Sequence, residues 1–168
     1  MKKLFFVLFA LVASVSSFSQ SNDVVDIAIS SKDHTTLVAA VKAADLVTTL
    51  KSKGPFTVFA PTNAAFDKLP AGTVASLLKP ENKAQLAKIL TYHVVSGNLD
   101  AAAVIAAIKA GNGSAVLTTV SGGKLTGSIE NGKVKLTDEN GKSAFVTTAD
   151  LKGSNGVVHV IDGVVLPK

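Results

Sequence analysis

The stretch VVHVI at residues 157–161 restricts the possible folds more than any other part of the chain. Every position except His159 is apolar, so the segment lacks the alternation typical of a strand with one face in water. A strand of this kind is covered on both faces. We therefore predict a central strand in which Val158 and Val160 point to one covered side. Val157 and Ile161 point to the other side.

Helical patterns in the first half of the chain can supply one of these covers. Leu37, Val41, Ala44 and Val47 recur at helical spacing. The predicted helices are Asn22–Ile29, Thr35–Leu50, a brief one capped by Thr62 or Asn63 and ending at Leu69, one opened by Pro80, and Ala101–Ala110 with Asp100 as N-cap and Gly111 as C-cap. A short strand, Phe56–Ala60, lies between the second and third of these helices.

The second half of the chain reads as strands separated by Gly-containing turn signals. The predicted strands before the last one are Ala115–Val120, Lys124–Ile129, Lys133–Thr137 and Ser143–Thr148. Helices followed by strands, with no linker or internal repeat, predict a single α+β domain. We place this domain at residues 20–168.

Residues 1–19 have the layout of a secretory signal peptide: a basic start, an apolar run over 4–15, and small residues at Ser17 and Ser19. The apolar run is too short for a membrane span, so the alternative of an anchor is not favoured. Cleavage after Ser19 leaves 15 lysines and 12 acidic residues in the mature chain. We expect a secreted or periplasmic protein with no transmembrane segment.

The sequence contains no recognisable catalytic or cofactor motif. It lacks cysteine, a Gly-x-Ser-x-Gly elbow and a phosphate-binding loop, and its three histidines match no metal-ligand spacing. It also lacks arginine and has few aromatics, which disfavours nucleic acid. We expect no enzyme activity, cofactor or metal. His159 is predicted to be a core residue whose ring bonds a backbone carbonyl.

Three stretches resemble the conserved segments of the fasciclin domain family. GPFTVFAPTNAAFDKLP, residues 54–70, resembles its first signature, and SNGVVHVIDGVVLP, residues 154–167, resembles its second. LTYHVVSG, residues 90–97, resembles its tyrosine–histidine motif. The resemblance implies a wedge-shaped β-sandwich flanked by helices, in which the two signatures form adjacent core strands.

The resemblance also implies a non-enzymatic role in adhesion or extracellular interaction. It assigns partner binding to Tyr92 and His93, and to Asp150 and Leu151, where Leu151 replaces the Ile of the family's Asp-Ile pair. The implied partner is a cell-surface or matrix protein, with a polysaccharide as a second class. For Asp150 and Leu151 a purely local role in the following turn and core remains the alternative.

Two functions remain open at this point: an adhesion module, and a carrier of an apolar small molecule in a cleft between sandwich and helices. An exposed apolar patch would favour the first, and an apolar cleft of several hundred Å³ the second. The sequence NGS at residues 112–114 is also a formal N-glycosylation site.

Overall fold

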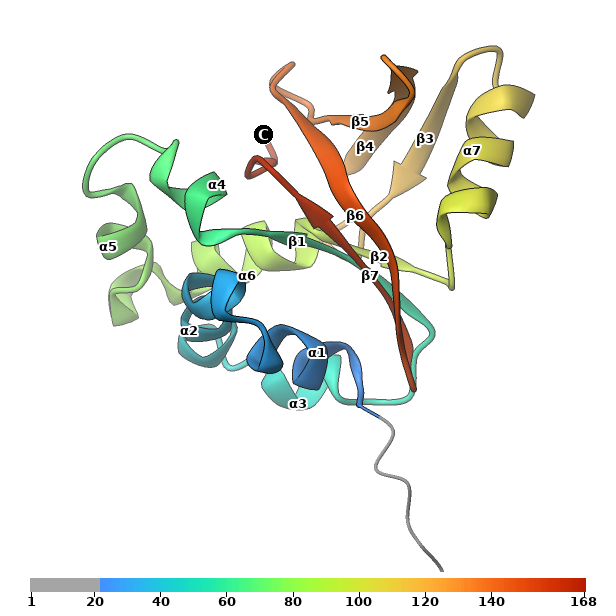
Figure 1. The fold of residues 1–168 in the computed structure, drawn as a ribbon. Coiled ribbons are helices and arrows are strands. Elements are labelled where there is room, and N and C mark those ends of the chain that lie inside the picture. The colour runs from blue at the N-terminus through green and yellow to red at the C-terminus, as the bar shows by residue number, and fades with distance from the viewer. Residues whose placement is uncertain (1–21) are drawn as a thin grey trace, which may run out of the picture.

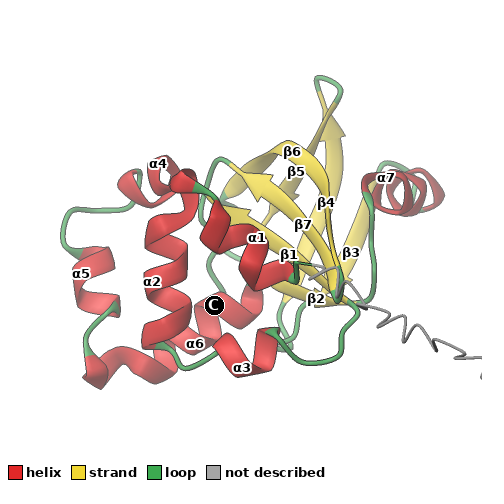
Figure 2. Ribbon diagram, turned by 60° about the horizontal axis from the view of Figure 1, so that its bottom comes forward, coloured by secondary structure: helices red, strands yellow, loops and turns green. Residues whose placement is uncertain are grey.

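A layer of helices packs against one strongly bent sheet in this protein (Figure 1 and Figure 2). The structure is a computed structural model that describes residues 22–168. The predicted signal peptide, residues 1–19, lies outside the described residues. None of the described helices combines the length and the apolar character that a membrane crossing requires.

The helices lie mainly in the first half of the chain, as predicted. They are α1 (Val24–Ser30), η1 (Lys32–His34), α2 (Thr35–Ala43), α3 (Val47–Leu50), α4 (Asn63–Asp67), α5 (Thr73–Leu77), η2 (Pro80–Asn82), α6 (Lys83–Tyr92) and α7 (Ala101–Ala110). Two caps are those that the sequence predicts. The Thr62 hydroxyl accepts the Ala65 N–H, and the Asp100 carboxylate accepts the Ala103 N–H.

Seven strands form a sheet in the order β2-β1-β7-β6-β5-β4-β3. They are β1 (Phe56–Pro61), β2 (Val94–Ser96), β3 (Ser114–Thr118), β4 (Lys124–Glu130), β5 (Lys133–Thr137), β6 (Ser143–Gly153) and β7 (Gly156–Ile161). An isolated bridge between Val95 and Thr119 brings the two ends of the sheet together. The sheet therefore folds back on itself as a wedge, and the predicted α+β class is confirmed.

The last strand, β7, is central and buried along its whole length, as predicted. It runs parallel to β1, pairing Val58 with Val158, and antiparallel to β6. Val158 belongs to the core between the sheet and the helices. Ile161 belongs to a second core inside the bent sheet, where it joins Phe59 and Tyr92. The two family signatures thus form adjacent strands that separate two cores.

The predicted helix Thr35–Leu50 is wrong, because the structure divides it into α2 and α3. Asp45 adopts a left-handed conformation with φ of 59°, and the Leu46 N–H reaches back to the Val41 carbonyl. Short polar residues tolerate this conformation, which ends a helix. The apolar spacing continues across the break because Leu50 of α3 packs in the same core as α2.

Three short elements, η1, β2 and α5, were not predicted, and β6 is longer than predicted. Asp150 and Leu151, which we expected to precede a turn, lie within β6. The strand accommodates them through shifts in its register with β7 between Val146 and Leu151. This irregular stretch of β6 brings Asp150 to the start of α7.

Candidate interaction surfaces

Tyr92 lies inside the molecule at the end of α6. Its side chain is fully buried, and its hydroxyl donates to the Lys124 carbonyl at 2.6 Å and accepts from the Glu139 N–H at 3.2 Å. Burial raises the pKa of the phenol above its usual value. The residue therefore ties α6 to the β3–β4 and β5–β6 turns in this structure.

His93 is the neighbouring residue and is also buried. The Val165 N–H donates to its Nε2 at 3.3 Å, so its Nδ1–H donates to the Ile89 carbonyl at 2.8 Å. Burial lowers the pKa of the ring to about 4, although the Ile89 carbonyl and Asp138 oppose this shift. Partner binding by Tyr92 and His93 stays a prediction, and it requires this segment to open because neither side chain reaches the surface.

His159 is a buried core residue, as the sequence predicts. The Asp150 N–H donates to Nδ1 at 3.3 Å, and Nε2 donates to the Leu99 carbonyl at 2.8 Å. The ring also stacks on Phe59 with centroids 5.6 Å apart. The predicted bond to a backbone carbonyl is confirmed. It holds the chain immediately before α7.

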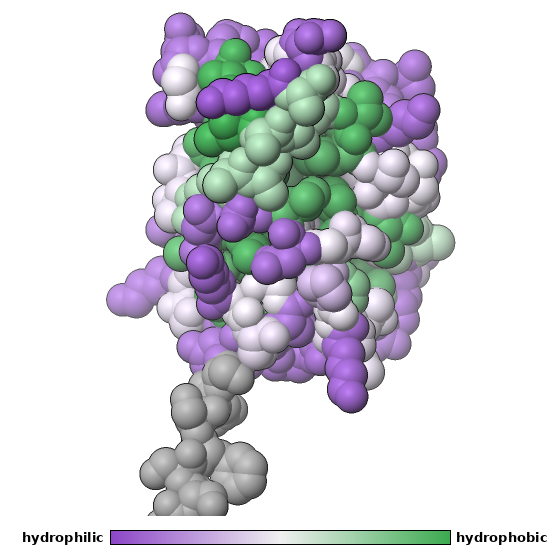
Figure 3. Space-filling view, turned by 90° about the vertical axis from the view of Figure 1, so that its right-hand side faces the viewer, coloured by the Kyte–Doolittle hydropathy of each residue, from purple (hydrophilic) through white to green (hydrophobic). Residues whose placement is uncertain are grey.

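Helix α7 presents an apolar side chain on almost every side. Nine of its ten residues, AAAVIAAIKA, are Ala, Val or Ile, but only Val104 and Ile108 are buried against the sheet. Ala102 and Ala106 are exposed and Ile105 is partly exposed. Figure 3, which views the molecule from the side of α7, shows apolar residues gathered in one patch with hydrophilic residues around it.

Residues of β6 extend this patch beside the helix. Val146 and Ala149 line a small cavity together with Ala101 of α7, and both retain exposed area. We call Ala102, Ile105, Ala106, Val146 and Ala149 the α7 face. The sequence analysis missed it, although a ten-residue segment that is apolar on all sides is a signal of either a buried helix or a contact surface.

Asp150 lies at the edge of the α7 face, next to Ala149. Its Oδ1 accepts the N–H of Ala101, the first residue of α7, at 2.8 Å, and its own φ is 61°. Leu151 is partly buried and packs against the helix-side core. Asp150 therefore bonds a backbone N–H as the local alternative proposed, but that N–H belongs to α7 and not to the following turn. Partner binding by either residue stays a prediction.

Substitution of Asp150 by asparagine separates positioning of α7 from direct partner contact. Asp150→Asn keeps an acceptor for the Ala101 N–H, so we expect it to melt within about 3 °C of the parent and to adhere normally. Asp150→Ala removes the acceptor, and its melting temperature and adhesion should both fall. Normal melting of Asp150→Asn with lost adhesion would contradict this expectation and indicate direct contact through the charge.

An apolar cavity also lies between the helices and β1, but it is small. Residues of α1, α2, α3 and α6 line it, among them Val25, Val41 and Leu90, and its volume is about 40 Å³. Pockets for small molecules usually measure about 300–1,000 Å³. The cavity therefore gives no support to the carrier hypothesis.

Comparisons with known proteins agree with the motifs. The model of the fasciclin domain matches residues 32–167. Protein sll1483 of Synechocystis sp. is 50% identical over 156 residues, which cover 93% of this chain and 79% of that protein. Immunogenic protein MPB70 of Mycobacterium bovis is 39% identical over 161 residues, covering 92% and 74% of the two chains.

A solved structure shows the same fold. The FAS1 domain pair of the insect cell adhesion molecule Fasciclin I aligns with a TM-score of 0.63 at 21% identity, covering 77% of this chain and 43% of that chain. The family match spans both signatures, which form the paired strands β1 and β7 at the centre of the sheet. With this match along most of its length, the chain belongs to the fasciclin domain family.

Proposed function

We propose that this protein is an exported, non-enzymatic adhesion module that binds a protein partner through its α7 face. The observation that carries the proposal is the exposure of apolar side chains on α7. A surface helix without a partner ordinarily carries polar side chains on the face that is turned to water. Exposed apolar patches of this kind are typical of interaction sites.

The geometry around α7 supports the proposal, because the helix is held firmly in place. Asp100 caps its first turn, Asp150 accepts the Ala101 N–H, and His159 holds the preceding Leu99 carbonyl. A contact surface that is already ordered loses little conformational entropy when a partner binds. The three polar contacts thus keep the α7 face ordered before a partner binds.

Export of the protein is supported by two observations of different kinds. Residues 1–19 have the pattern of a signal peptide, although they lie outside the described residues. The related structure belongs to a protein described as an insect cell adhesion molecule. We therefore place the mature domain at the cell surface, in the periplasm or in the medium.

A charged residue on the α7 face tests the proposal. In Ala106→Glu, a carboxylate stands at an exposed helical position, so folding should be unaffected while capture of partners from surface extracts falls about tenfold or more. Ala39→Glu is the matched control, because Ala39 is an exposed alanine within α2. Equal capture by parent and Ala106→Glu, with both correctly folded, would contradict binding through α7.

A further inference from the structure

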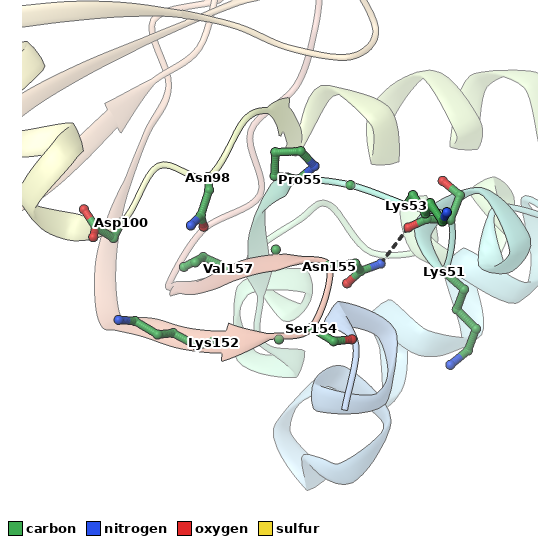
Figure 4. A pocket seen from close by; sticks show the side chains of 13 residues that line it. Lys51, Lys53, Pro55, Asn98, Asp100, Lys152, Ser154, Asn155 and Val157 are labelled. Atoms are coloured by element: carbon green, nitrogen blue, oxygen red, sulfur yellow. Dashed lines mark hydrogen bonds between the residues drawn. The ribbon is translucent and has the colours of Figure 1, made fainter. Parts of the chain in front are cut away.

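A polar hollow of about 600 Å³ lies at the tip of the β6–β7 hairpin. The loop that precedes β1 and the segment that leads into α7 form one wall, and residues 152–157 of the hairpin form the other (Figure 4). Its side chains include Lys53, Lys152 and Asn98, while Val157 contributes an apolar surface. The first residues of both family signatures, 54–55 and 154–157, contribute to its lining, whereas no residue of the α7 face does.

The hairpin wall is fixed by the side chain of Asn155. Its amide nitrogen donates to the Leu50 and Ser52 carbonyls at 2.7 and 3.1 Å, and its Oδ1 accepts the Val24 N–H at 3.0 Å. Figure 4 shows one of these bonds reaching across to the opposite loop. The Phe56 N–H donates to the Asn155 carbonyl at 3.0 Å as well, so hairpin and loop form one rigid unit.

The segment around Asn98, in the opposite wall, is held in place by Thr57, whose side chain is completely buried. Its hydroxyl donates to the Gly97 carbonyl at 2.7 Å and accepts the Leu99 N–H at 2.8 Å, which holds the chain on both sides of Asn98. Figure 4 shows the Asn98 amide pointing into the space near Val157. Within residues 22–168 this amide has no hydrogen-bond partner, so it is available to a ligand.

The charges of the hollow are mainly positive. Asp23 and Asp26 neutralise Lys51 at 2.8 and 2.6 Å. The ammonium groups of Lys53 and Lys152 form no ion pair with any residue that the structure describes, and both side chains are exposed. In Figure 4 they lie toward opposite ends of the hollow. Among residues 22–168, Asp100 is the one carboxylate in the lining, and its Oδ1 already accepts the Ala103 N–H.

We propose that this hollow binds an acidic polysaccharide. Two separated lysines match carboxylates spaced along a glycan chain, and the Asn98 amide and Ser154 hydroxyl between them match its hydroxyl groups. In the part of the chain that the structure describes, neither arginine nor an aromatic side chain lines the hollow, which disfavours phosphates held in a bidentate manner and stacked bases. The site is separate from the α7 face, so it does not rest on the function proposed above.

Binding of polygalacturonate by the exported protein tests the proposal, with neutral dextran and polyglutamate as comparison ligands. We expect polygalacturonate to bind and dextran not to bind. Replacement of both cations in Lys53→Ala/Lys152→Ala should weaken binding about tenfold or more. Lys133→Ala/Lys142→Ala is the matched control, since it removes two exposed lysines outside the hollow, and it should change affinity less than about twofold.

Three results would overturn the assignment: no binding of polygalacturonate, an equal loss in both double variants, or polyglutamate bound as tightly as the polysaccharide. Asn98→Ala should weaken binding without a change in charge, and an unaffected affinity would also contradict the site. Ala106→Glu should bind polygalacturonate as the parent does. Failure of adhesion through α7 and failure of this site are therefore distinguishable.

Discussion

Replacement of Val158 by aspartate is expected to destabilise the protein by about 4 kcal/mol or more, which lowers its melting temperature by about 10 °C or more. Val158 is 2% exposed and lies in the middle of β7, in the core between sheet and helices. An aspartate there lies among apolar side chains, so it must be buried either charged or protonated. Because domains are stable by only about 5–15 kcal/mol, much of the stability would be lost.

Val116→Asp is the matched control for this experiment. Val116 also lies in a strand, β3, but its side chain is 62% exposed at the edge of the sheet. The same substitution should therefore change the free energy of unfolding by less than about 1 kcal/mol. Thermal unfolding followed by circular dichroism measures both. A Val158→Asp variant that melts within a few degrees of the parent would show that β7 is not central.

Acidification from pH 7 to pH 4 is expected to destabilise the protein by up to about 3 kcal/mol through His93 alone. Burial lowers the pKa of the folded His93 to about 4, from an ordinary value of 6.5. Between these values the unfolded chain binds a proton that the folded protein excludes, so stability falls with falling pH. Above about pH 6.5 the ring is neutral in both states, and the contribution to pH dependence vanishes.

Denaturant unfolding at pH 7, 5.5 and 4.5 measures this effect in the parent and in His93→Gln. The variant loses hydrogen bonds to Ile89 or Val165 and is less stable at pH 7, but its stability should depend less on pH. Burial also lowers the pKa of His34, so His34→Gln should flatten the curve too. Parallel curves for the parent and His93→Gln over this range would exclude His93 as a source of the pH dependence.

Much of the fold could be predicted because its strongest signals are local. The apolar run of β7, which only His159 interrupts, the turn signals between β3 and β6, and the caps at Thr62 and Asp100 each depend on a few neighbouring residues. The break at Asp45 and the irregular stretch around Asp150 could not be predicted in this way. Both depend on a left-handed aspartate, which tertiary contacts favour and the sequence pattern does not reveal.

The candidate sites were harder to predict than the fold, since exposure depends on how the elements pack. The sequence shows that α7 is apolar on all sides but not which side the sheet leaves uncovered. The sequence shows Tyr92 and His93 within the tyrosine–histidine motif but not that both are buried. The hollow combines residues from three separate parts of the chain, so no single segment indicates it.

The position of β7 also determines how the chain can fold. Phe56 and Gly156, which are partners in the register, are 100 residues apart along the chain. This pairing is parallel and joins residues far apart in the sequence. The chain therefore loses the entropy of loop closure before the stabilising contacts of β7 form, which slows folding. Val158 of β7 is part of the core beneath the helices, so this core stays incomplete until β7 takes its place in the sheet. Helices and sheet should therefore acquire stable structure together, in one late cooperative step.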